Sequence, residues 1–311
     1  MPAPDDDRTV GNIRVTLRQL EMFSVLPSHS TLSSAAAELH ISESALSQAI
    51  TQVERAAGEH LCVRRKGRGL QLTPAGRHFA AQASKIVRAS EELLLNPSQD
   101  RAPLRGPVHL GCFASLAPHL LPAILSEVRQ RFPDIDLQLM AGTHDELLPQ
   151  LESGHLDAML AYDLHLPGGF AKRRLYSTQL EAVLPQDHPL TAQTTVSLAD
   201  LAGEDLLLYG TNPSTATVYA AFEAAGLTPK IIMTVPQMIL ARELVAHGVG
   251  YTVQMSRPRE HRLSLEGRPF AIRPIEPTAG PTSVVAMWPL GMQLTPRASA
   301  VLDIAAETCA S

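Results

Sequence analysis

Residues 31–54, TLSSAAAELHISESALSQAITQVE, contain two short apolar stripes with a break between them, and this pattern constrains the fold more than any other part of the chain. From Leu32 to Leu39 apolar residues recur at i, i+3, i+4 and i+7, which predicts a short helix with one buried face. The pattern stops at residues 40–41, and Ser42 is then a suitable N-cap for a second helix with a stripe from Leu46 to Val53. The stretch therefore predicts two short helices joined by a tight turn, a helix-turn-helix.

The second of these helices would carry a polar face opposite its apolar stripe. Each of these polar side chains can hydrogen-bond to a base edge or a phosphate, and none is a bulky apolar residue. With the N-cap included, they are Ser42, Glu43, Ser44, Ser47, Gln48, Thr51 and Gln52. An ordinary helical hairpin with a solvated polar face is the simpler interpretation of so short a pattern taken alone.

The residues that follow favour a nucleic-acid-binding domain. Leu61–Val63 and Leu70–Leu72 predict two strands, and residues 66–69, KGRG, predict a tight turn between them. The resulting hairpin is positively charged and suited to binding phosphates, because it carries Arg64, Arg65, Lys66 and Arg68. Helix pair and hairpin together make a winged helix-turn-helix.

Residues 15–95 resemble the N-terminal domain of LysR-type transcriptional regulators. The motifs that carry the resemblance occur in order at the family's spacing: LRQLEMF at 17–23, the stretch 31–54, and LQLTPAG at 70–76. Glu43 departs from the family, where Gln is common at this position. A carboxylate can accept from cytosine N4, so the preferred DNA site is expected to differ from that of relatives.

Charge is divided unevenly along the chain. The chain as a whole has a net charge of -5, yet residues 11–90 contain ten Lys or Arg and five acids, which makes this segment basic and the remainder acidic. A basic head on an acidic body is expected to bind nucleic acid with one end only.

A long helix is predicted after the hairpin, because Thr73 is a suitable N-cap and Pro74 suits the first helical position. Its apolar seam of Phe79, Ile86 and Leu93 is longer than one small domain needs. The resemblance implies that this helix is the dimerisation linker, and the alternative is a helix packed only on its own domain. The expected organisation is a winged helix-turn-helix at 14–72, a linker helix at 73–95 and a hinge rich in proline at 96–107.

From residue 108 to 311 strands alternate with helices, which predicts a parallel α/β domain. The expected strands are 108–112, 136–140, 157–160, 180–184, 206–209 and 284–288, and the expected helices are 118–132, 146–152, 215–225, 236–247 and 296–308. The order predicts a clamshell like that of periplasmic solute-binding proteins, with lobe I at 108–177 and 270–311 and lobe II at 178–269.

Residues 104–308 also resemble the LysR-type effector-binding domain, through LLPAIL, GHLDAMLAYD, LPQDHPL and ELVAHGVGYTV. The resemblance implies that a small-molecule effector binds between the lobes. Candidate contacts lie at strand ends and helix starts, where hydroxyls and amides converge. They are Ala114, Ser115, Thr143, Tyr162, Thr211, Asn212 and Ser214.

Two further interpretations qualify these candidates. Thr143 and Ser214 are as well suited to capping a helix as to contacting an effector, and Ser115 is less well suited to capping. Tyr162 occupies a position where some relatives that bind acidic aromatics carry Arg, so a dicarboxylate effector is disfavoured.

Membrane, metal and enzyme functions find little support. No apolar run reaches the roughly 18 residues of a membrane span, no secretory signal opens the chain, and a cytoplasmic location is expected. Cys62, Cys112 and Cys309 are unclustered, which argues against a disulfide framework or a metal site. HExxH, CxxC, GxSxG, GxGxxG and the P-loop are absent from the sequence, so no cofactor is expected.

The sequence thus predicts a DNA-binding regulator controlled by a small-molecule effector. Its partners would be double-stranded DNA with an interrupted palindrome and further copies of itself, as a homodimer or homotetramer. Two alternatives remain: a ligand-binding or scaffolding protein whose helix-turn-helix serves only packing, and an enzyme on a solute-binding fold.

Overall fold

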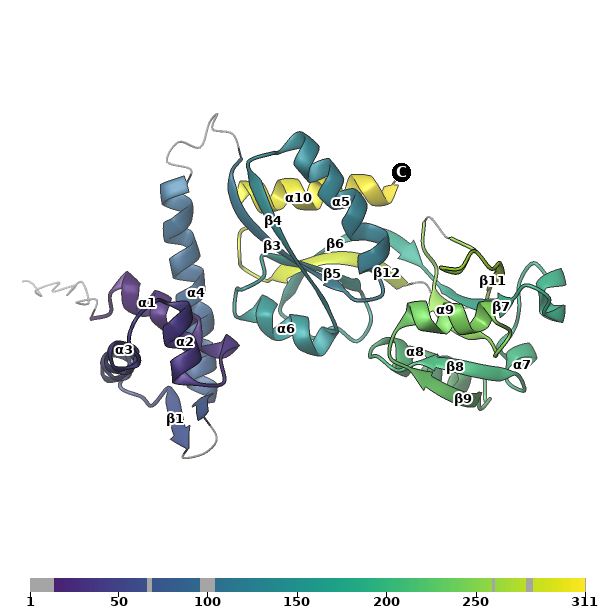
Figure 1. Ribbon diagram of the computed structural model, residues 1–311, viewed down its shortest axis with the longest axis horizontal. Helices are drawn as coiled ribbons and strands as arrows, with labels where there is room; N and C mark the ends of the chain where they lie inside the picture. Colours follow the sequence, from purple (N-terminus) through teal and green to yellow (C-terminus); the bar gives the residue numbers. More distant parts are fainter. Residues whose placement is uncertain (1–13, 66–68, 96–103, 259–260, 278–281, 311) are drawn as a thin grey trace, which may run out of the picture. The chain divides into compact units, whose positions relative to one another are not determined.

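The computed structural model describes residues 14–65, 69–95, 104–258, 261–277 and 282–310 (Figure 1). The chain forms two compact units, Met1–Ala102 with Glu152–His155 and Pro103–Leu151 with Leu156–Ser311. Within the described parts of the chain, no helix combines the length and the apolar character needed to cross a membrane.

The first unit is the predicted winged helix-turn-helix followed by a long helix. Its elements are α1 (Leu17–Ser24), η1 (Leu26–Ser28), α2 (Leu32–Glu38), α3 (Glu43–Ala57), β1 (Cys62–Arg65), β2 (Gly69–Leu72) and α4 (Pro74–Leu95). The hydroxyl of Thr31 caps α2 by accepting from Ser34 N–H, and that of Ser42 caps α3 by accepting from Ala45 N–H. Gly58 ends α3 with a φ of 70°, a conformation that glycine adopts without strain.

The buried faces of these helices meet in one core, which contains Phe23, Leu46, Ile50 and Leu61. Small side chains let α2 approach closely, since Ala35 and Ala36 are both buried there. The predicted stripes at residues 32–39 and 46–53 are therefore the faces that hold the two helices together.

The second unit contains a five-stranded sheet in the order β4-β3-β5-β12-β6. The elements of this first lobe are β3 (Gly106–Phe113), α5 (Ala117–Arg131), β4 (Ile135–Gly142), α6 (His144–Glu152), β5 (Ala158–Tyr162), β6 (Phe170–Thr178), β12 (Thr282–Pro289) and α10 (Pro296–Ala310). Strands β3, β4 and β5 are parallel as predicted, but β12 runs antiparallel to both β5 and β6. The sheet is therefore mixed.

The second lobe contains a three-stranded antiparallel sheet, β10-β7-β11, and the parallel pair β8-β9. Its elements are β7 (Leu180–Pro185), η2 (Pro189–Ala192), α7 (Leu198–Leu201), β8 (Asp205–Tyr209), α8 (Ser214–Ala224), β9 (Lys230–Val235), α9 (Met238–Ala246), β10 (Thr252–Met255) and β11 (Phe270–Pro274).

The return from the second lobe to the first differs from the sequence prediction. The first crossing falls at Gln179, between β6 and β7, close to the predicted boundary. Strand β11, however, pairs with β7, and its Phe270 and Ile272 are buried in the second lobe's core. The chain therefore returns after Pro274 and not near Phe270. Of the predicted hinge at 96–107, residues 96–103 lie outside the described residues and the last two belong to β3.

Gly76 is required by a close backbone contact at the start of α4. A Cβ built there would lie 1.9 Å from the carbonyl oxygen of Leu61. We expect Gly76→Ala to destabilise the first unit by about 2 kcal/mol or more, because backbone has to move. In urea unfolding, the part of the circular-dichroism signal that belongs to the helices of the first unit should be lost at lower urea, while the transition followed by the fluorescence of Trp288 in the second unit should not shift.

The matched control is Gly203→Ala, since a Cβ at Gly203 would meet no atom within 4 Å. Equal effects of the two substitutions on the circular-dichroism transition would contradict this account of Gly76.

Candidate functional site

Several hydroxyls on the polar face of α3 are engaged within the helix. Ser42 caps the helix and its hydroxyl lies 3.0 Å from that of Ser44. The hydroxyl of Thr51 donates to the carbonyl of Ser47 at 3.0 Å. Part of the hydrogen-bonding capacity of these hydroxyls is therefore already used within the helix, and the rest is open to solvent.

The exposed surface of α3 also includes two longer side chains. Glu43 and Gln48 are exposed, and they lie about one and a half turns apart. Gln52, one turn further on, is hydrogen-bonded to Gln19 of α1. The first half of α3 therefore presents the reach and polarity needed to contact base edges.

The wing is tied to α3 through a carboxylate. Oε1 of Glu54 accepts from the N–H groups of Leu61 at 2.8 Å and Cys62 at 2.9 Å. Strand β1 pairs with β2 from Cys62 to Arg65, and Arg64 belongs to it. The predicted contacts Lys66 and Arg68 lie outside the described residues.

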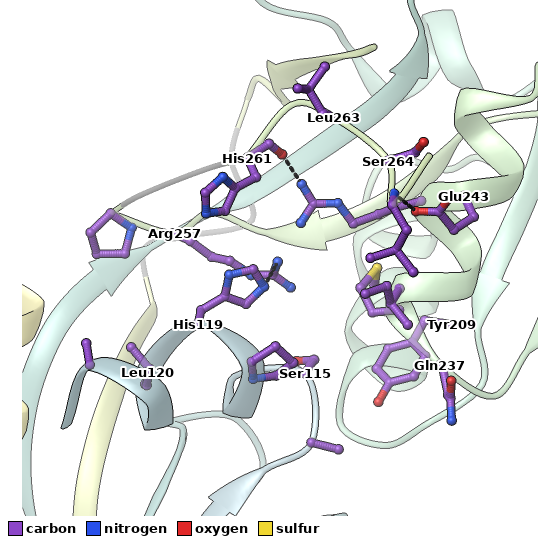
Figure 2. A pocket seen from close by; sticks show the side chains of 18 of the residues that line it. Ser115, His119, Leu120, Tyr209, Gln237, Glu243, Arg257, His261, Leu263 and Ser264 are labelled. Atoms are coloured by element: carbon purple, nitrogen blue, oxygen red, sulfur yellow. Dashed lines mark hydrogen bonds between the residues drawn. The ribbon is translucent and has the colours of Figure 1, made fainter. Parts of the chain in front are cut away.

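A cavity of about 770 Å³ lies in the second unit (Figure 2). It is lined by the start of α5 in the first lobe, and by the start of α9 and residues 257, 258, 261 and 263–265 in the second lobe. Apolar side chains make up much of the lining: Leu120, Met238, Ile239, Leu263 and Leu265. Figure 2 shows His119 and Arg257 adjacent to each other at this cavity.

His119 accepts a hydrogen bond from Arg257, with 2.5 Å between its Nε2 and the arginine Nη1. Burial, followed by the positive charges of Arg257 and Arg242, lowers the pKa of His119 to about 3. The imidazole is therefore neutral at physiological pH, which is what allows Nε2 to accept. Tyr162 hydrogen-bonds to Arg257 as well as to Ser115, and burial raises its pKa.

Arg242 and Glu243 line the same cavity from α9, and each is held by a hydrogen bond. The Arg242 side chain is buried, donates to the carbonyl of His261, and lies 4.8 Å over the ring of Phe270. The carboxylate of Glu243 accepts from Leu265 N–H at 2.7 Å, which fixes the segment that covers this end.

A second cavity, of about 20 Å³, adjoins the first and shares Ser115, Met238 and Arg257 with it. Gln254 lines it from β10 and is only 3% exposed. Neither the amide nitrogen nor the amide oxygen of Gln254 has a hydrogen-bond partner among the described residues.

The predicted effector contacts fall into two groups. Ala114 and Ser115 line the larger cavity, while Ser115, Tyr162 and Ser214 line the smaller one. The other three, Thr143, Thr211 and Asn212, lie outside the lining of both cavities.

The two threonines of this second group form hydrogen bonds at the starts of helices. At the start of α6 the hydroxyl of Thr143 accepts from Glu146 N–H at 3.3 Å, and the carboxylate of Glu146 accepts from Thr143 N–H at 2.8 Å. The carbonyl of Thr211 accepts from Thr215 N–H at 3.1 Å. The capping alternative thus accounts for Thr143.

Sequence reasoning missed Arg242, Gln254 and Arg257 as lining residues. Arg257 follows β10, a strand that the sequence pattern did not reveal, so no strand-end signal pointed to it. His119 was visible four residues after Ser115, but nothing local identified Arg257 as its partner.

The low pKa of His119 predicts a loss of stability in acid. Above about pH 6.5 neither the folded nor the unfolded chain protonates this imidazole, whereas below it the unfolded chain takes up a proton that the folded chain does not. The free energy of unfolding should therefore fall as the pH drops from 6.5 towards 4. His119→Gln should reduce this slope, as measured by urea unfolding at successive pH values.

His144 contributes a similar loss, because burial lowers its pKa to about 4, so the comparison has to be made between variants. His78→Gln, at an exposed position of α4, is the matched control and should keep the wild-type slope. An unchanged slope in His119→Gln would contradict a neutral, buried His119.

Comparisons with known proteins agree with this architecture. The family described as "Bacterial regulatory helix-turn-helix protein, lysR family" matches residues 17–77, and "LysR substrate binding domain" matches residues 101–310. The hydrogen peroxide-inducible genes activator of Pectobacterium carotovorum is 29% identical over 249 residues, which cover 79% of this chain and 82% of that protein. The uncharacterized regulator YybE of Bacillus subtilis is 31% identical over 242 residues, covering 76% and 80%.

Among solved structures, HinK of Pseudomonas aeruginosa, a LysR family transcriptional regulator, is 28% identical with a TM-score of 0.61. The match covers 94% of this chain and 98% of that one. Members of this family are transcriptional regulators and not enzymes. Since the substrate-binding-domain match alone spans more than half of its length, the chain belongs to the LysR family of transcriptional regulators.

Proposed function

We propose that this regulator recognises a specific double-stranded DNA site through α3 and the wing, and that a small molecule bound between the two lobes controls this binding. The observation that carries the DNA-binding half is the exposed polar face of α3 beside a basic hairpin that Glu54 ties to the same helix. A helix of this kind fits the major groove, while a basic wing suits the phosphate backbone.

The contacts divide into two kinds. Ser47 and Gln48 are proposed to read base edges, with Glu43 and Ser44 at the start of the helix and Thr51 and Gln52 further along it. The wing residues Arg64, Arg65, Lys66 and Arg68 are proposed to contact phosphate or the minor groove. Base contacts supply sequence preference, and phosphate contacts supply affinity on any sequence.

Pairing of two copies through α4 is supported by its exposed apolar residues. Ile86 is 52% exposed and Leu93 is 74% exposed, and a spacing of seven residues puts them on one face. A homodimer paired in this way would present two DNA-binding heads to an interrupted palindrome.

The effector domain has a further surface suited to a second copy. Both β4 and β9 lie at sheet edges and expose apolar side chains, Leu139 and Met140 on β4 and Ile232 and Met233 on β9. Exposed apolar edge strands are suited to pairing with another chain, which would convert dimers into a homotetramer. A regulator of DNA would act in the cytoplasm.

The peroxide response in the name of one relative is not part of this proposal. The thiolate is the reactive form of cysteine, and burial raises the pKa of both Cys112 and Cys309, the latter to about 11. Two of the three cysteines are therefore poorly suited to react with peroxide at neutral pH. A non-covalently bound effector fits the cavity better.

Selection of fragments bound by the full chain from random double-stranded DNA tests the proposed function. We expect enrichment of an interrupted palindrome, bound about 10³-fold or more tightly than random DNA. Sequence-blind retention that disappears at moderate salt would instead show that the head is merely basic.

Substitutions separate the two kinds of contact. Arg64→Ala should weaken binding to selected and random DNA about equally, whereas Gln48→Ala should change the order of preference among sites by about 1–3 kcal/mol at one base position. Binding of each variant to a panel of single-base variants of the selected site measures both effects.

Arg268→Ala and Gln193→Ala, both at exposed positions in the second unit, are the matched controls and should bind as the wild type does. A uniform loss from both Arg64→Ala and Gln48→Ala would remove the proposed division between phosphate and base contacts.

A further inference from the structure

The two adjoining cavities of the second unit differ in size and in lining, and a ligand that fills both would need two different ends. The larger one, of about 770 Å³, has an apolar wall that includes Met238, Leu263 and Leu265. The smaller one, of about 20 Å³, is lined by both Gln254 and Arg257. Ser115 and Arg257 lie where the two cavities meet, because they line both.

Charge at this junction favours an anion. Among the described lining residues of the larger cavity there are two guanidinium groups, Arg242 and Arg257, and one carboxylate, Glu243. His119 adds no charge, since burial and the neighbouring arginines lower its pKa to about 3. The lining is therefore positive at neutral pH.

The helix ends add to this preference. Helices α5 and α9 both begin at the cavity, and their N-cap residues, Leu116 and Gln237, make no side-chain capping hydrogen bond. Backbone N–H groups at helix N-termini favour negative charge. Alone they would define no site, but here they lie at the same cavity as the two arginines.

Gln254 points to a polar ligand group at the junction. Its side chain is 97% buried, and neither amide atom has a hydrogen-bond partner among the described residues. An amide that stays unpaired in the protein interior destabilises the fold, so such a group is expected where a ligand or a water molecule completes it. An acid group reaching the junction could accept from the Gln254 amide nitrogen and from Arg257 together.

The opposite end of the ligand would meet exposed apolar side chains. Leu263 is 59% exposed and Leu265 is 79% exposed, and both line the larger cavity. Glu243 holds this segment in place through Leu265 N–H. An apolar ligand body would cover these side chains and remove their surface from water.

We propose that the effector is an organic acid with a single carboxylate and an apolar body. The carboxylate binds Arg257 at the junction, in reach of Ser115 and Gln254, and takes the place of His119 as an acceptor for the guanidinium. The apolar body lies in the larger cavity against Met238, Leu263 and Leu265. This assignment rests on the proposed effector-controlled function and names the chemical class of that effector.

Such a ligand would join the two lobes. Arg257 and Gln254 belong to the second lobe, while Ser115 and His119 belong to the first. Transfer of Arg257 from His119 to a carboxylate replaces a neutral acceptor with a charged one, and charged acceptors make the stronger hydrogen bonds. The ligand therefore favours the lobe arrangement in which it contacts both sides.

The test is isothermal titration calorimetry of the full chain with matched acids and amides: phenylacetate and phenylacetamide, cinnamate and cinnamamide, octanoate and octanamide. We expect at least one acid to bind, and its amide to bind about tenfold or more weakly, as expected for a hydrogen bond to a charged group. Arg257→Gln should weaken binding of that acid by a similar factor, and the affinity of Arg257→Lys for the acid should lie between those of Arg257→Gln and the wild type.

Two further variants separate binding from folding. Gln254→Leu should raise the melting temperature of the ligand-free protein, because it removes a buried unpaired amide, and should weaken binding of the acid. Arg268→Gln, an exposed arginine that lies outside both linings, should change neither. A cooperative urea-unfolding transition followed by the fluorescence of Trp288 establishes that the second unit of both variants is folded.

The proposal is overturned if no acid of the set binds, if each acid and its amide bind equally well, or if Arg257→Gln binds the acid as tightly as the wild type. Any of these results together with specific DNA binding would leave the regulator role standing and remove only the assigned effector class. If the wild type instead bound an acid but showed no DNA specificity, the effector class would stand and the proposed recognition of a specific DNA site would be removed.

Discussion

The backbone of Leu61 joins the three parts of the DNA-binding unit, and their arrangement depends on it. Its N–H donates to the carboxylate of Glu54 on α3 at 2.8 Å, and its carbonyl accepts from Thr73 N–H at the start of α4 at 2.9 Å. The side chain of Leu61 is buried in the core between them. Helix α3, the β1-β2 hairpin and α4 are thereby joined through one residue, and the absence of a side chain at Gly76 lets α4 approach the same carbonyl. Glu54 stabilises this arrangement, because its carboxylate accepts from two backbone N–H groups at once.

A comparable constraint operates where the chain crosses between the lobes of the second unit. The hydroxyl of Thr178, the last residue of β6, donates to the carbonyl of Ser256 at 2.7 Å, and Gln179 N–H donates to the Ser256 hydroxyl at 3.1 Å. These bonds fix the residue that precedes Arg257 against the crossing itself. The guanidinium therefore extends from a residue next to the crossing, and its hydrogen bond to His119 joins the second lobe to the first.

Sequence patterns predicted those parts of the structure that local interactions determine. The helices of the DNA-binding unit have caps within four residues and complete apolar stripes, so Ser42 and Thr73 marked their starts correctly. Strands β6, β9, β10 and β11 were not predicted, because their short or charged sequences, such as KRR at 172–174, show no clean alternation and pair only with distant strands. The same reason explains the error at Phe270, which the pairing of β11 with β7 assigns to the second lobe. The cavity was predicted only in outline, since Arg257 reaches His119 across 138 residues of sequence.

The DNA-binding unit and the cavity also differ in how well their polar groups are paired. In the DNA-binding unit, polar groups at the helix starts find partners a few residues away, as Thr31 and Ser42 do, and such caps stabilise the fold. At the cavity, by contrast, a buried glutamine amide lacks a partner among the described residues, at an expected cost of about 1–3 kcal/mol. A buried histidine there is also kept neutral beside two arginines. The unpaired amide lowers the stability of the ligand-free state, and a ligand that pairs with it recovers that free energy. A ligand can shift an equilibrium between lobe arrangements only by its difference in affinity for them. Polar groups left incomplete at the junction of the lobes are a physical source of that difference.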